Sequence, residues 1–416
     1  MTNFFIKLSL NVIYVFSCVI FVSSAYAIDL RSYPKLQAIA DELIAEKHYT
    51  QAELEALFAP AQIQQSVLKA MKSPAESKFT WGKYRKLFLK EDRIQQGVDF
   101  WLEYKDSLSR AEQQYGVPAS VIVAIIGVES KFGRYKGKHK VLDSLVSLVV
   151  DFPRRSAFFA KELKQFLILT KENRLNSSQV LGSYAGAVGF PQFISSSYRA
   201  YAIDFSGDGI ADLINEPVDA IGSVANYFVE NGWLRGQPVS SKPHLTVPSS
   251  VADLANRKRK IQFSAQSLTD KGAQLSSTIP SDELLNVLML DASEVVHETA
   301  NSGFYIVRAG DTACQIAERL KVTCNSLISL NKLDNKATVF RDQRLKVPQK
   351  KTNTVKASSG SIGQTHGDVE QTSKVQERYF YTHENFYVIT RYNHSVLYAM
   401  AVNDLSQAID AAMAAN

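Results

Sequence analysis

The chain has 416 residues, of which 45% are hydrophobic and 21% are charged, with a net charge of +6 and three cysteines. This length exceeds what one core usually serves, so we expect about two or three folded units, and the composition excludes a collagen-like, repetitive or wholly disordered chain. Forty-seven basic residues nearly balance 41 acidic ones, which argues against a dedicated nucleic-acid-binding protein, and three cysteines are too few for a disulfide-dense scaffold.

Residues 1–27 have the pattern of a cleaved secretory signal peptide. A single charge at Lys7 precedes the apolar run of residues 8–22, and small residues ending at Ala27 form an A-x-A cleavage site. A transmembrane anchor is the alternative, but polar residues interrupt the run; a lipoprotein anchored at Cys18 would need small residues where a bulky aromatic one stands. We therefore expect a periplasmic mature chain that begins at Ile28 and has no transmembrane segment.

From residue 33 to about residue 174, apolar residues recur at spacings of three and four, which predicts helices. Residues 50–53 form a capping box at the start of one of them. Pro118 stands at an expected first helical position, ahead of the almost wholly apolar residues 121–128, and a helix that is apolar on every face is a buried one. Glycine-rich loops and a helix over 218–231 follow.

After residue 233 the pattern changes to short apolar runs at 260–263 and 284–290 that predict strands. A compact unit follows at 304–348, and then a stretch up to residue 376 with almost no core-forming residues, which predicts a flexible linker. The last segment predicts a strand over 386–390 and a helix after Ser395. Such a short strand and helix cannot hold a core alone, so we expect them to pack on the first domain, with the compact unit inserted.

The compact unit resembles a LysM module along its whole length. The resemblance rests on Tyr305-Ile306-Val307-Arg308-Ala309-Gly310-Asp311-Thr312, Ile316-Ala317, Leu327, Asn331, Leu333 and Leu345-Lys346-Val347-Pro348. It implies a βααβ fold over residues 303–349 that binds glycans containing N-acetylglucosamine, such as peptidoglycan or chitin. Gly310 to Thr312 read as a turn and helix cap, and Asn331 as a side chain that ties a loop to the backbone.

Cys314 and Cys324 both lie in this unit. In a straight helix their spacing would span about 15 Å, too far for a disulfide, so a bond requires the chain to turn back after Val322. An oxidising exported compartment favours a disulfide, and two buried free thiols are the alternative.

The rest of the mature chain resembles the lytic murein transglycosylase B family over residues 28–300 and 377–416. The segments that carry the resemblance lie at 117–133, 151–155, 182–193, 204–209 and 391–395. They include Val128-Glu129-Ser130-Lys131-Phe132-Gly133, Gly182-Ser183-Tyr184-Ala185-Gly186 and Arg391-Tyr392-Asn393-His394-Ser395. The resemblance implies an α+β fold: a mainly helical, lysozyme-like catalytic domain with a small β-containing subdomain, interrupted by the LysM module and a linker at 350–376.

Glu129 is the candidate catalytic acid. It closes the buried apolar helix, where low dielectric and the negative helix end both oppose ionisation, so we expect a raised pKa and a carboxyl group suited to general acid catalysis. The alternative from the residues alone is a helix-end glutamate paired with Lys131 or Arg134. The family resemblance favours catalysis.

The motifs mark no second carboxylate for a base or nucleophile, which most glycosidases have. The resemblance implies a lyase-type reaction: Glu129 protonates the oxygen of the MurNAc–GlcNAc β-1,4 bond, and the C6 hydroxyl of muramic acid attacks to leave a 1,6-anhydroMurNAc end. A hydrolytic muramidase is the close alternative. A non-catalytic wall-binding scaffold or regulator is the alternative from another class. We expect no catalytic cofactor, and peptidoglycan strands as the partner.

By motif match, the resemblance also implies side chains that line the substrate cleft: Ser183, Gln192, Tyr84, Tyr227, Tyr392 and Asn393. The glycines between Ser183 and Gln192 would let the backbone approach a sugar closely. Tyr84 and Tyr227 are equally compatible with packing in the core.

Residues 204–209 begin like an EF-hand loop, with oxygen ligands at alternating positions and a glycine for the turn. The expected donors of a structural Ca²⁺ site are Asp204, Ser206, Asp208, the backbone of Ile210, and Asp219. Asp219 as the closing ligand is implied by the resemblance, while Glu216 and Asp212 compete with it. A capped turn without metal is the alternative.

Overall fold

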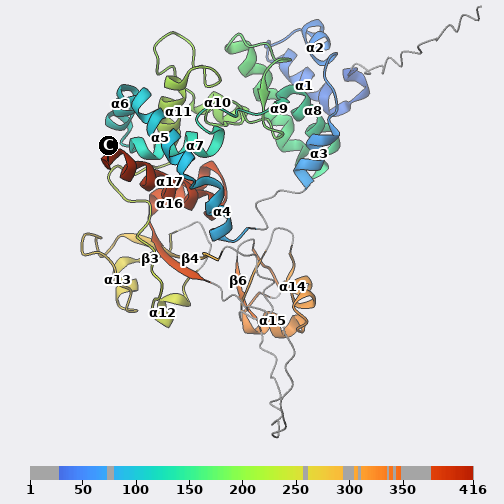
Figure 1. Cartoon of the computed structure of the whole chain (residues 1–416). Coiled ribbons are helices and arrows are strands. Elements are labelled where there is room, and N and C mark those ends of the chain that lie inside the picture. The colour runs from blue at the N-terminus through green and yellow to red at the C-terminus, as the bar shows by residue number, and fades with distance from the viewer. Residues whose placement is uncertain are drawn as a thin grey trace, which may run out of the picture.

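The computed structural model describes residues 28–72, 79–255, 261–293, 304–307, 311–334, 337–340, 343–347 and 376–415 (Figure 1). The expected signal peptide and its Cys18 lie outside the described residues, as do Gly310 and all of the expected linker except Gln376. Within the described ranges, no helix combines the length and the apolar character that crossing a membrane requires.

The helical body consists of two neighbouring groups of helices (Figure 1). The first contains α1 (Pro34–Ala45), α2 (Gln51–Phe58), α3 (Gln65–Lys72), α8 (Val141–Asp151) and α9 (Ser156–Glu172), with the short 3-10 helices η1 (Leu30–Ser32) and η3 (Pro153–Arg155). The second contains α4 (Trp81–Phe88), α5 (Glu91–Glu103), α6 (Lys105–Tyr115), α7 (Ala119–Ser130), α11 (Pro217–Glu230), α16 (Glu384–Tyr392) and α17 (Val396–Ala415). Helix α10 (Ser195–Tyr201) contacts both α9 and α11. One continuous hydrophobic core joins the two groups.

Helix α7 lies at the centre of the second group, in contact with α5, α6, α11 and α17. Every residue from Ala119 to Gly127 is buried, as its all-round apolar sequence predicts. Pro118, expected as the first helical residue, is instead the N-cap of α7, so the helix begins one residue later, at Ala119. The capping box predicted for α2 is confirmed, because the side chains and backbone of Thr50 and Glu53 bond reciprocally.

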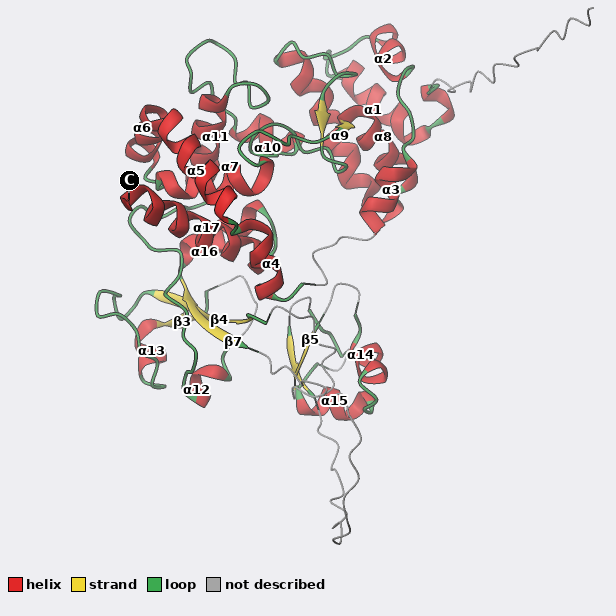
Figure 2. Ribbon diagram, viewed as in Figure 1, coloured by secondary structure: helices red, strands yellow, loops and turns green. Residues whose placement is uncertain are grey.

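A three-stranded antiparallel sheet packs below this body, in the order β3 (Phe263–Ser264), β4 (Leu284–Asp291), β7 (Glu377–Thr382) (Figure 2). Alternate residues of β4 enter different cores: Leu285, Val287 and Met289 join a small core with α12 (Ser249–Ala252) and α13 (Ala265–Thr269), while Leu288 and Leu290 join the main core. Both faces of β4 are therefore buried, which explains its continuous apolar sequence.

The compact unit is inserted between two adjacent strands of this sheet. Strand β4 ends at Asp291 and β7 begins at Glu377, and the two strands pair along their length from Asn286 with Thr382 to Asp291 with Glu377. A further backbone hydrogen bond of 2.7 Å, from Ala292 N to Gln376 O, extends this pairing. The expectation that the terminal segment packs on the first domain is confirmed, since α17 contacts α4, α5 and α7 and residues of 386–390 join the main core.

The described part of the unit has the predicted βααβ order: β5 (Phe304–Ile306), α14 (Ala313–Arg319), α15 (Cys324–Leu330) and β6 (Arg344–Lys346). Strands β5 and β6 pair antiparallel. Thr312 and Gln315 form a capping box at α14, and Asn331 bonds to the backbone of Leu327 and Lys346, so the predicted helix cap and the predicted role of Asn331 are confirmed. The turn expected at Gly310 lies outside the described residues. The core is small: Tyr305, Val307, Ile316, Ala317, Leu327, Leu345 and Val347.

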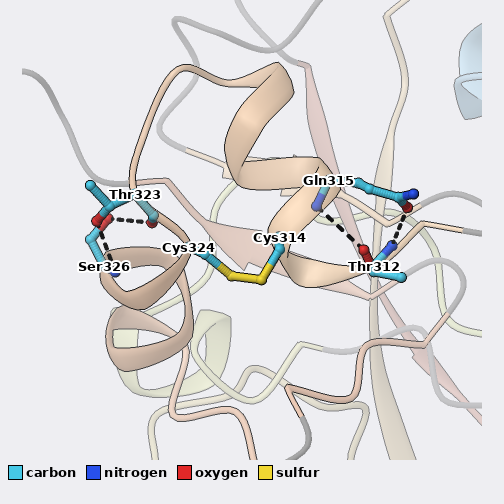
Figure 3. Close-up of a disulfide and its surroundings, with 6 residues drawn as sticks. All are labelled: Thr312, Cys314, Gln315, Thr323, Cys324 and Ser326. Atoms are coloured by element: carbon cyan, nitrogen blue, oxygen red, sulfur yellow. Dashed lines mark hydrogen bonds between the residues drawn. A yellow bond between two sulfur atoms is a disulfide. The ribbon is translucent and has the colours of Figure 1, made fainter.

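A disulfide joins Cys314 to Cys324, with their Cα atoms 4.7 Å apart (Figure 3). Helix α14 ends at Arg319, and Lys321 adopts a left-handed φ of 53°. Helix α15 then begins at Cys324. This turn supplies the reversal that a disulfide at this spacing requires.

The strand predicted at 386–390 was wrong, and the strand predicted at 260–263 was wrong in part. Residues 386–390, expected as a strand, lie in α16, and the terminal strand is β7 at Glu377–Thr382. A short run of aromatic and β-branched residues does not distinguish a strand from a buried helix by pattern alone, and packing in the main core decides it. In the run at 260–263, only Phe263 belongs to a strand, while Lys260 lies outside the described residues.

Candidate active site

Glu129 lies half-buried in the last turn of α7. Two consecutive left-handed residues end the helix, Lys131 with φ 53° and Phe132 with φ 59°. Their N–H groups turn back to the carbonyls of Gly127 and Ile126, at 3.2 and 3.3 Å. This ending satisfies carbonyls that would otherwise be orphaned, and it fixes the backbone that carries the Glu129 carboxyl group.

Tight packing holds this turn from both sides. A Cβ on Gly127 would lie 2.5 Å from the Phe132 ring, and a Cβ on Gly133 would lie 2.1 Å from the Phe190 ring, so both positions require glycine. The buried Arg93 of α5 donates a 2.9 Å hydrogen bond to the Gly127 carbonyl. A cation at this end of α7 complements the negative pole of the helix.

Tyr398 of α17 contacts the Glu129 carboxylate directly. Its hydroxyl donates a 2.6 Å hydrogen bond to Glu129 Oε1, and its side chain is almost completely buried. Burial, followed by the negative charge of Glu129, raises the pKa of Tyr398 well above its usual value. Tyr398 therefore stays protonated and remains a hydrogen-bond donor across the physiological pH range.

An aromatic cluster continues from Tyr398 away from Glu129. Tyr392 of α16 stacks on Tyr398 with a ring separation of 6.3 Å, and Tyr227 of α11 packs edge-on against Tyr392 at 4.8 Å. Phe193 lies 5.5 Å from Tyr227 and 5.6 Å from Tyr392. The Tyr392 hydroxyl donates to the carbonyl of Pro191 at 2.5 Å, so the cluster clamps the glycine-rich loop onto α16. Burial and the charge of Glu129 also raise the pKa of Tyr392.

The loop between Ser183 and Gln192 is held mainly by its own polar side chains. The Ser183 hydroxyl accepts hydrogen bonds from the N–H groups of Ala185 and Ala187, at 3.2 and 3.0 Å. Gln192 takes a left-handed φ of 51°, and its Nε2 donates to the carbonyls of Lys136 and Gly189, at 3.2 and 3.0 Å. Both side chains are half-buried and well fixed.

The structure thus brings Glu129, Tyr392 and the loop that carries Gln192 together. Tyr227 belongs to the same cluster but is 7% exposed, and Tyr84 of α4 is 1% exposed. Tyr84 lies close enough to Tyr398 to contribute to the raised pKa of that tyrosine, so it is a neighbour of the site within the core. Asn393 is the half-buried C-cap of α16.

The structure does not support the alternative that Glu129 pairs with a neighbouring cation. In the described part of the chain, neither Lys131 nor Arg134 forms an ion pair, and both side chains are exposed. The Glu129 carboxyl group instead accepts the hydrogen bond from Tyr398.

The expected metal loop brings carboxylate oxygens of Asp204, Asp208 and Asp219 within 4.8 Å of one another. Asp219 is fully buried, and its carboxylate accepts hydrogen bonds from the N–H groups of Phe205 and Asp212, both at 2.8 Å. The Ser206 hydroxyl donates to Asp204 at 3.2 Å.

The two competing ligands are engaged elsewhere. Asp212 accepts hydrogen bonds from the backbone of Ile214 and Asn215, and Glu216 caps α11 through the N–H of Val218. Among the described residues, the group of converging carboxylates contains Asp219 and neither Asp212 nor Glu216.

Sequence reasoning missed Tyr398. The motif that ends at Ser395 lies three residues before it, and the following apolar face of α17 predicts only core packing. A tyrosine on the buried part of a helix needs a partner for its hydroxyl, which is the one signal that singles it out.

Comparison with known proteins gives consistent results. The family model described as a transglycosylase SLT domain matches residues 32–313 and 311–407. The chain is 33% identical over 390 residues to the Escherichia coli protein named membrane-bound lytic murein transglycosylase B, covering 92% of this chain and 84% of that protein.

Two solved structures are similar along nearly their whole length. The soluble lytic transglycosylase SltB1 from Pseudomonas aeruginosa matches with a TM-score of 0.67 and 32% identity, over 91% of this chain and 98% of that one. The Escherichia coli lytic transglycosylase Slt35, solved in complex with calcium, matches with a TM-score of 0.68 and 31% identity, over 94% of this chain and 97% of that one.

Proposed function

The chain belongs to the transglycosylase SLT domain family and is a peptidoglycan lytic transglycosylase with a lysozyme-like fold, and on this premise we propose that Glu129 is its catalytic acid. The observation that carries the proposal is the hydrogen bond from Tyr398 to Glu129 Oε1, which orients a half-buried carboxyl group beside the aromatic cluster and the Ser183–Gln192 loop. The proposed reaction cleaves the β-1,4 bond between MurNAc and GlcNAc and leaves a 1,6-anhydroMurNAc end.

The proposed reaction has two steps. Protonated Glu129 donates its proton to the glycosidic oxygen, the bond from C1 of MurNAc to that oxygen breaks, and the GlcNAc end leaves as an alcohol. The acetamido oxygen of MurNAc stabilises the positive C1. The C6 hydroxyl then attacks C1 and gives its proton to the Glu129 carboxylate, so the acid is regenerated and no water is consumed.

The Ser183–Gln192 loop and the aromatic residues fit a role in holding the sugars. The loop is rigid, and its Gly186 and Gly189 take φ values of 87° and 76° that favour glycine. We assign hydrogen bonding with substrate to Ser183, Gln192 and Asn393, and ring contact to Tyr392. Tyr84 and Tyr227 support the cleft from within, because both are buried.

Mass spectrometry of the muropeptides released from purified sacculi tests the reaction. The expected products carry 1,6-anhydro ends, and reducing ends in their place would establish hydrolysis. Glu129→Gln should release no product while its melting temperature stays unchanged. The control is Glu91→Gln, an exposed glutamate at the start of α5, which should release the same products as the wild type. Equal release by Glu129→Gln and wild type would contradict the assignment.

We propose that residues 303–349 form a LysM module that tethers the enzyme to peptidoglycan. The βααβ order, the capped α14 and the Asn331 contacts support this proposal. Because a tether raises the local substrate concentration, its loss should reduce cleavage of sacculi more than cleavage of short soluble strands.

Deletion of the module is structurally feasible, because β4 and β7 are neighbouring antiparallel strands that a short loop can join. In a Glu129→Gln background, the deletion should strongly reduce co-sedimentation with sacculi, leaving only the binding of the cleft, and should leave the melting of the helical body unchanged. Undiminished co-sedimentation would refute the tether.

We also propose a structural Ca²⁺ site formed by Asp204, Ser206, Asp208, the Ile210 backbone and Asp219. Hard oxygen donors of this kind suit calcium, and the convergence of three carboxylates supports the fit. Calcium should raise the melting temperature of the wild type, and a chelator should reverse this rise. Asp208→Ala should lose the response, whereas an unchanged melting temperature with calcium and with chelator would count against the site.

We propose that the enzyme acts in the periplasm after removal of residues 1–27. Sequencing of the amino terminus of the protein isolated from that compartment should read from Ile28. A lipid-modified amino terminus would contradict this proposal.

A further inference from the structure

A cluster of positive charge follows Glu129 directly. Residues 131–140, which we call the cationic segment, contain five lysine or arginine residues and one histidine and no acidic residue. The chain as a whole is nearly balanced, with 47 basic against 41 acidic residues. This local excess has no part in the proposed chemistry of Glu129.

Both ends of the cationic segment are fixed to the candidate active site. At its start, Tyr135 N donates a 2.8 Å hydrogen bond to the carbonyl of Ser130, the residue after Glu129. At its end, β1 (His139–Lys140) pairs antiparallel with β2 (Leu181–Gly182), which leads directly into Ser183. Gln192 also donates to the Lys136 carbonyl. The segment therefore runs alongside the loop that carries Ser183 and Gln192.

The segment fits closely against this loop in the middle as well. Gly137 has a φ of 100°, and a Cβ at this position would lie 2.1 Å from the backbone of Gly182. Lys136 is used structurally, since its Nζ donates to the Ile214 carbonyl at 2.7 Å and lies 4.6 Å from the centre of the Phe190 ring. The contacts with the site thus hold the backbone of the cationic segment in place. The other lysine and arginine side chains of the segment extend from this fixed backbone.

Four cations of the segment face solvent: Lys131, Arg134, Lys138 and Lys140. Their side chains form no ion pair or hydrogen bond with any residue in the described ranges. Two apolar side chains lie among them, Tyr135 with 54% and Leu181 with 49% exposure. Exposed cations next to exposed apolar groups suit a flexible anionic ligand that also has aliphatic parts.

The substrate offers one such ligand beside the bond that Glu129 cleaves. Sugar hydroxyl and acetamido groups carry no charge, and the carboxylates of peptidoglycan belong to the stem peptides or, where these have been removed, to the lactyl groups of MurNAc. We propose that Lys131, Arg134, Lys138 and Lys140 form a binding surface for stem-peptide carboxylates and give the enzyme a preference for peptide-bearing strands. This inference rests on the proposed function, because it places MurNAc at Glu129.

Binding measured without turnover tests the surface. In a Glu129→Gln background, Lys131, Arg134, Lys138 and Lys140 are all replaced by Gln, and binding is compared on soluble glycan strands with stem peptides and on the same strands stripped by an amidase. The control variant replaces four other exposed cations that lie outside the segment: Lys47, Lys69, Lys72 and Lys161. The melting temperature of both variants should match that of their parent.

The segment variant should bind peptide-bearing strands about tenfold more weakly than its parent, since several exposed charge pairs are each worth a modest amount. On stripped strands its binding should change less than about twofold, and the control variant should match the parent on both substrates. Raising the salt concentration should weaken the parent more than the segment variant.

Three outcomes would overturn the proposal. Equal weakening on both kinds of strand would show that the cations contact the glycan itself, and weakening confined to stripped strands would assign them to the lactyl carboxylate. Unchanged binding to both would remove any role in recognition. Because the experiment measures binding by an inactive variant, a negative result would not contradict the reaction proposed for Glu129. If the product assay showed no 1,6-anhydro ends, the binding experiment would still test whether the four cations bind stem-peptide carboxylates.

Discussion

The Tyr398 hydroxyl donates a 2.6 Å hydrogen bond to Glu129 Oε1 and joins residues that are 269 positions apart in the sequence. Glu129 lies in the last turn of the buried helix α7, and Tyr398 lies in α17, beyond the inserted unit. The proposed catalytic carboxyl group is therefore hydrogen-bonded by the part of the chain that follows the insertion. This relationship explains why the last helix must pack on the first domain for the site to form.

Replacing Tyr398 with Phe should lower kcat/KM about tenfold to a hundredfold, since a hydrogen bond to a charged group is worth about 1.5–3 kcal/mol. The hydroxyl stabilises the carboxylate form of Glu129, so its removal favours the protonated form, and the basic limb of the pH profile should move to higher pH. The ring that stacks on Tyr392 is kept, so the melting temperature should change little. A parallel loss of activity at all pH values would contradict this role.

The buried helix α7 and the carboxyl group in its last turn could be predicted because the signals for them lie within a short stretch of sequence. Residues 121–128 are apolar on every face, which specifies burial before any partner is known. The capping box at Thr50 and the helix cap at Thr312 could likewise be predicted, since each depends on residues within one helical turn.

The parts that could not be predicted depend on long-range packing. Helix α16 replaces an expected strand because its aromatic and β-branched residues are buried against the main core. The sequence signals that the Tyr398 hydroxyl needs a partner but not that Glu129 is that partner, since the contact depends on how α17 packs on α7. The Cys314–Cys324 disulfide could not be decided from the sequence, because it requires the left-handed turn at Lys321.

Gly133→Ala should destabilise the protein more than a matched glycine substitution. A Cβ would strain a residue with φ 79° and lie 2.1 Å from the Phe190 ring, and relieving that overlap costs about 1–3 kcal/mol beyond the backbone strain. Gly236→Ala is the control, because Gly236 has φ 76° and no atom within 4 Å of the added Cβ. Denaturant unfolding measures both; equal losses would show that Phe190 moves aside without cost.

Arg85→Leu should destabilise the protein at neutral pH and much less in acid. Arg85 Nε lies 2.9 Å from Asp404 Oδ2, and burial raises the pKa of Asp404 although this bond opposes the shift. The pKa of Asp404 is therefore higher in the folded protein than in the unfolded chain, where it is near 3.8. The contribution of Asp404 to the free energy of unfolding is fully present below the unfolded pKa and is lost as the pH rises through the folded pKa. Removing Arg85 raises that pKa further and enlarges the loss at neutral pH.

The expected cost of Arg85→Leu at pH 7 is about 0.5–1 kcal/mol, because Arg85 is half exposed and solvent screens the pair. The measurement is the difference in melting temperature from the wild type at pH 4 and at pH 7. Arg31→Leu is the control, since Arg31 is 78% exposed and lies 3.7 Å from Glu55, and it should have little effect at either pH. A deficit for Arg85→Leu that is as large at pH 4 as at pH 7 would refute the role of Asp404.

Replacing Cys314 and Cys324 together with Ser should destabilise the inserted unit by about 3 kcal/mol, the value expected when a loop of this length is no longer closed in the unfolded chain. The loss matters because the core cluster in the described part of the unit has only seven buried apolar residues, too few to tolerate it easily. Calorimetry of the full chain should show an early transition moving to lower temperature, while the transition of the helical body stays in place. Reductant should reproduce this shift in the wild type and leave the double variant unaffected. If both transitions moved together, the unit would be melting as part of the helical body, and the disulfide would not be a local stabiliser.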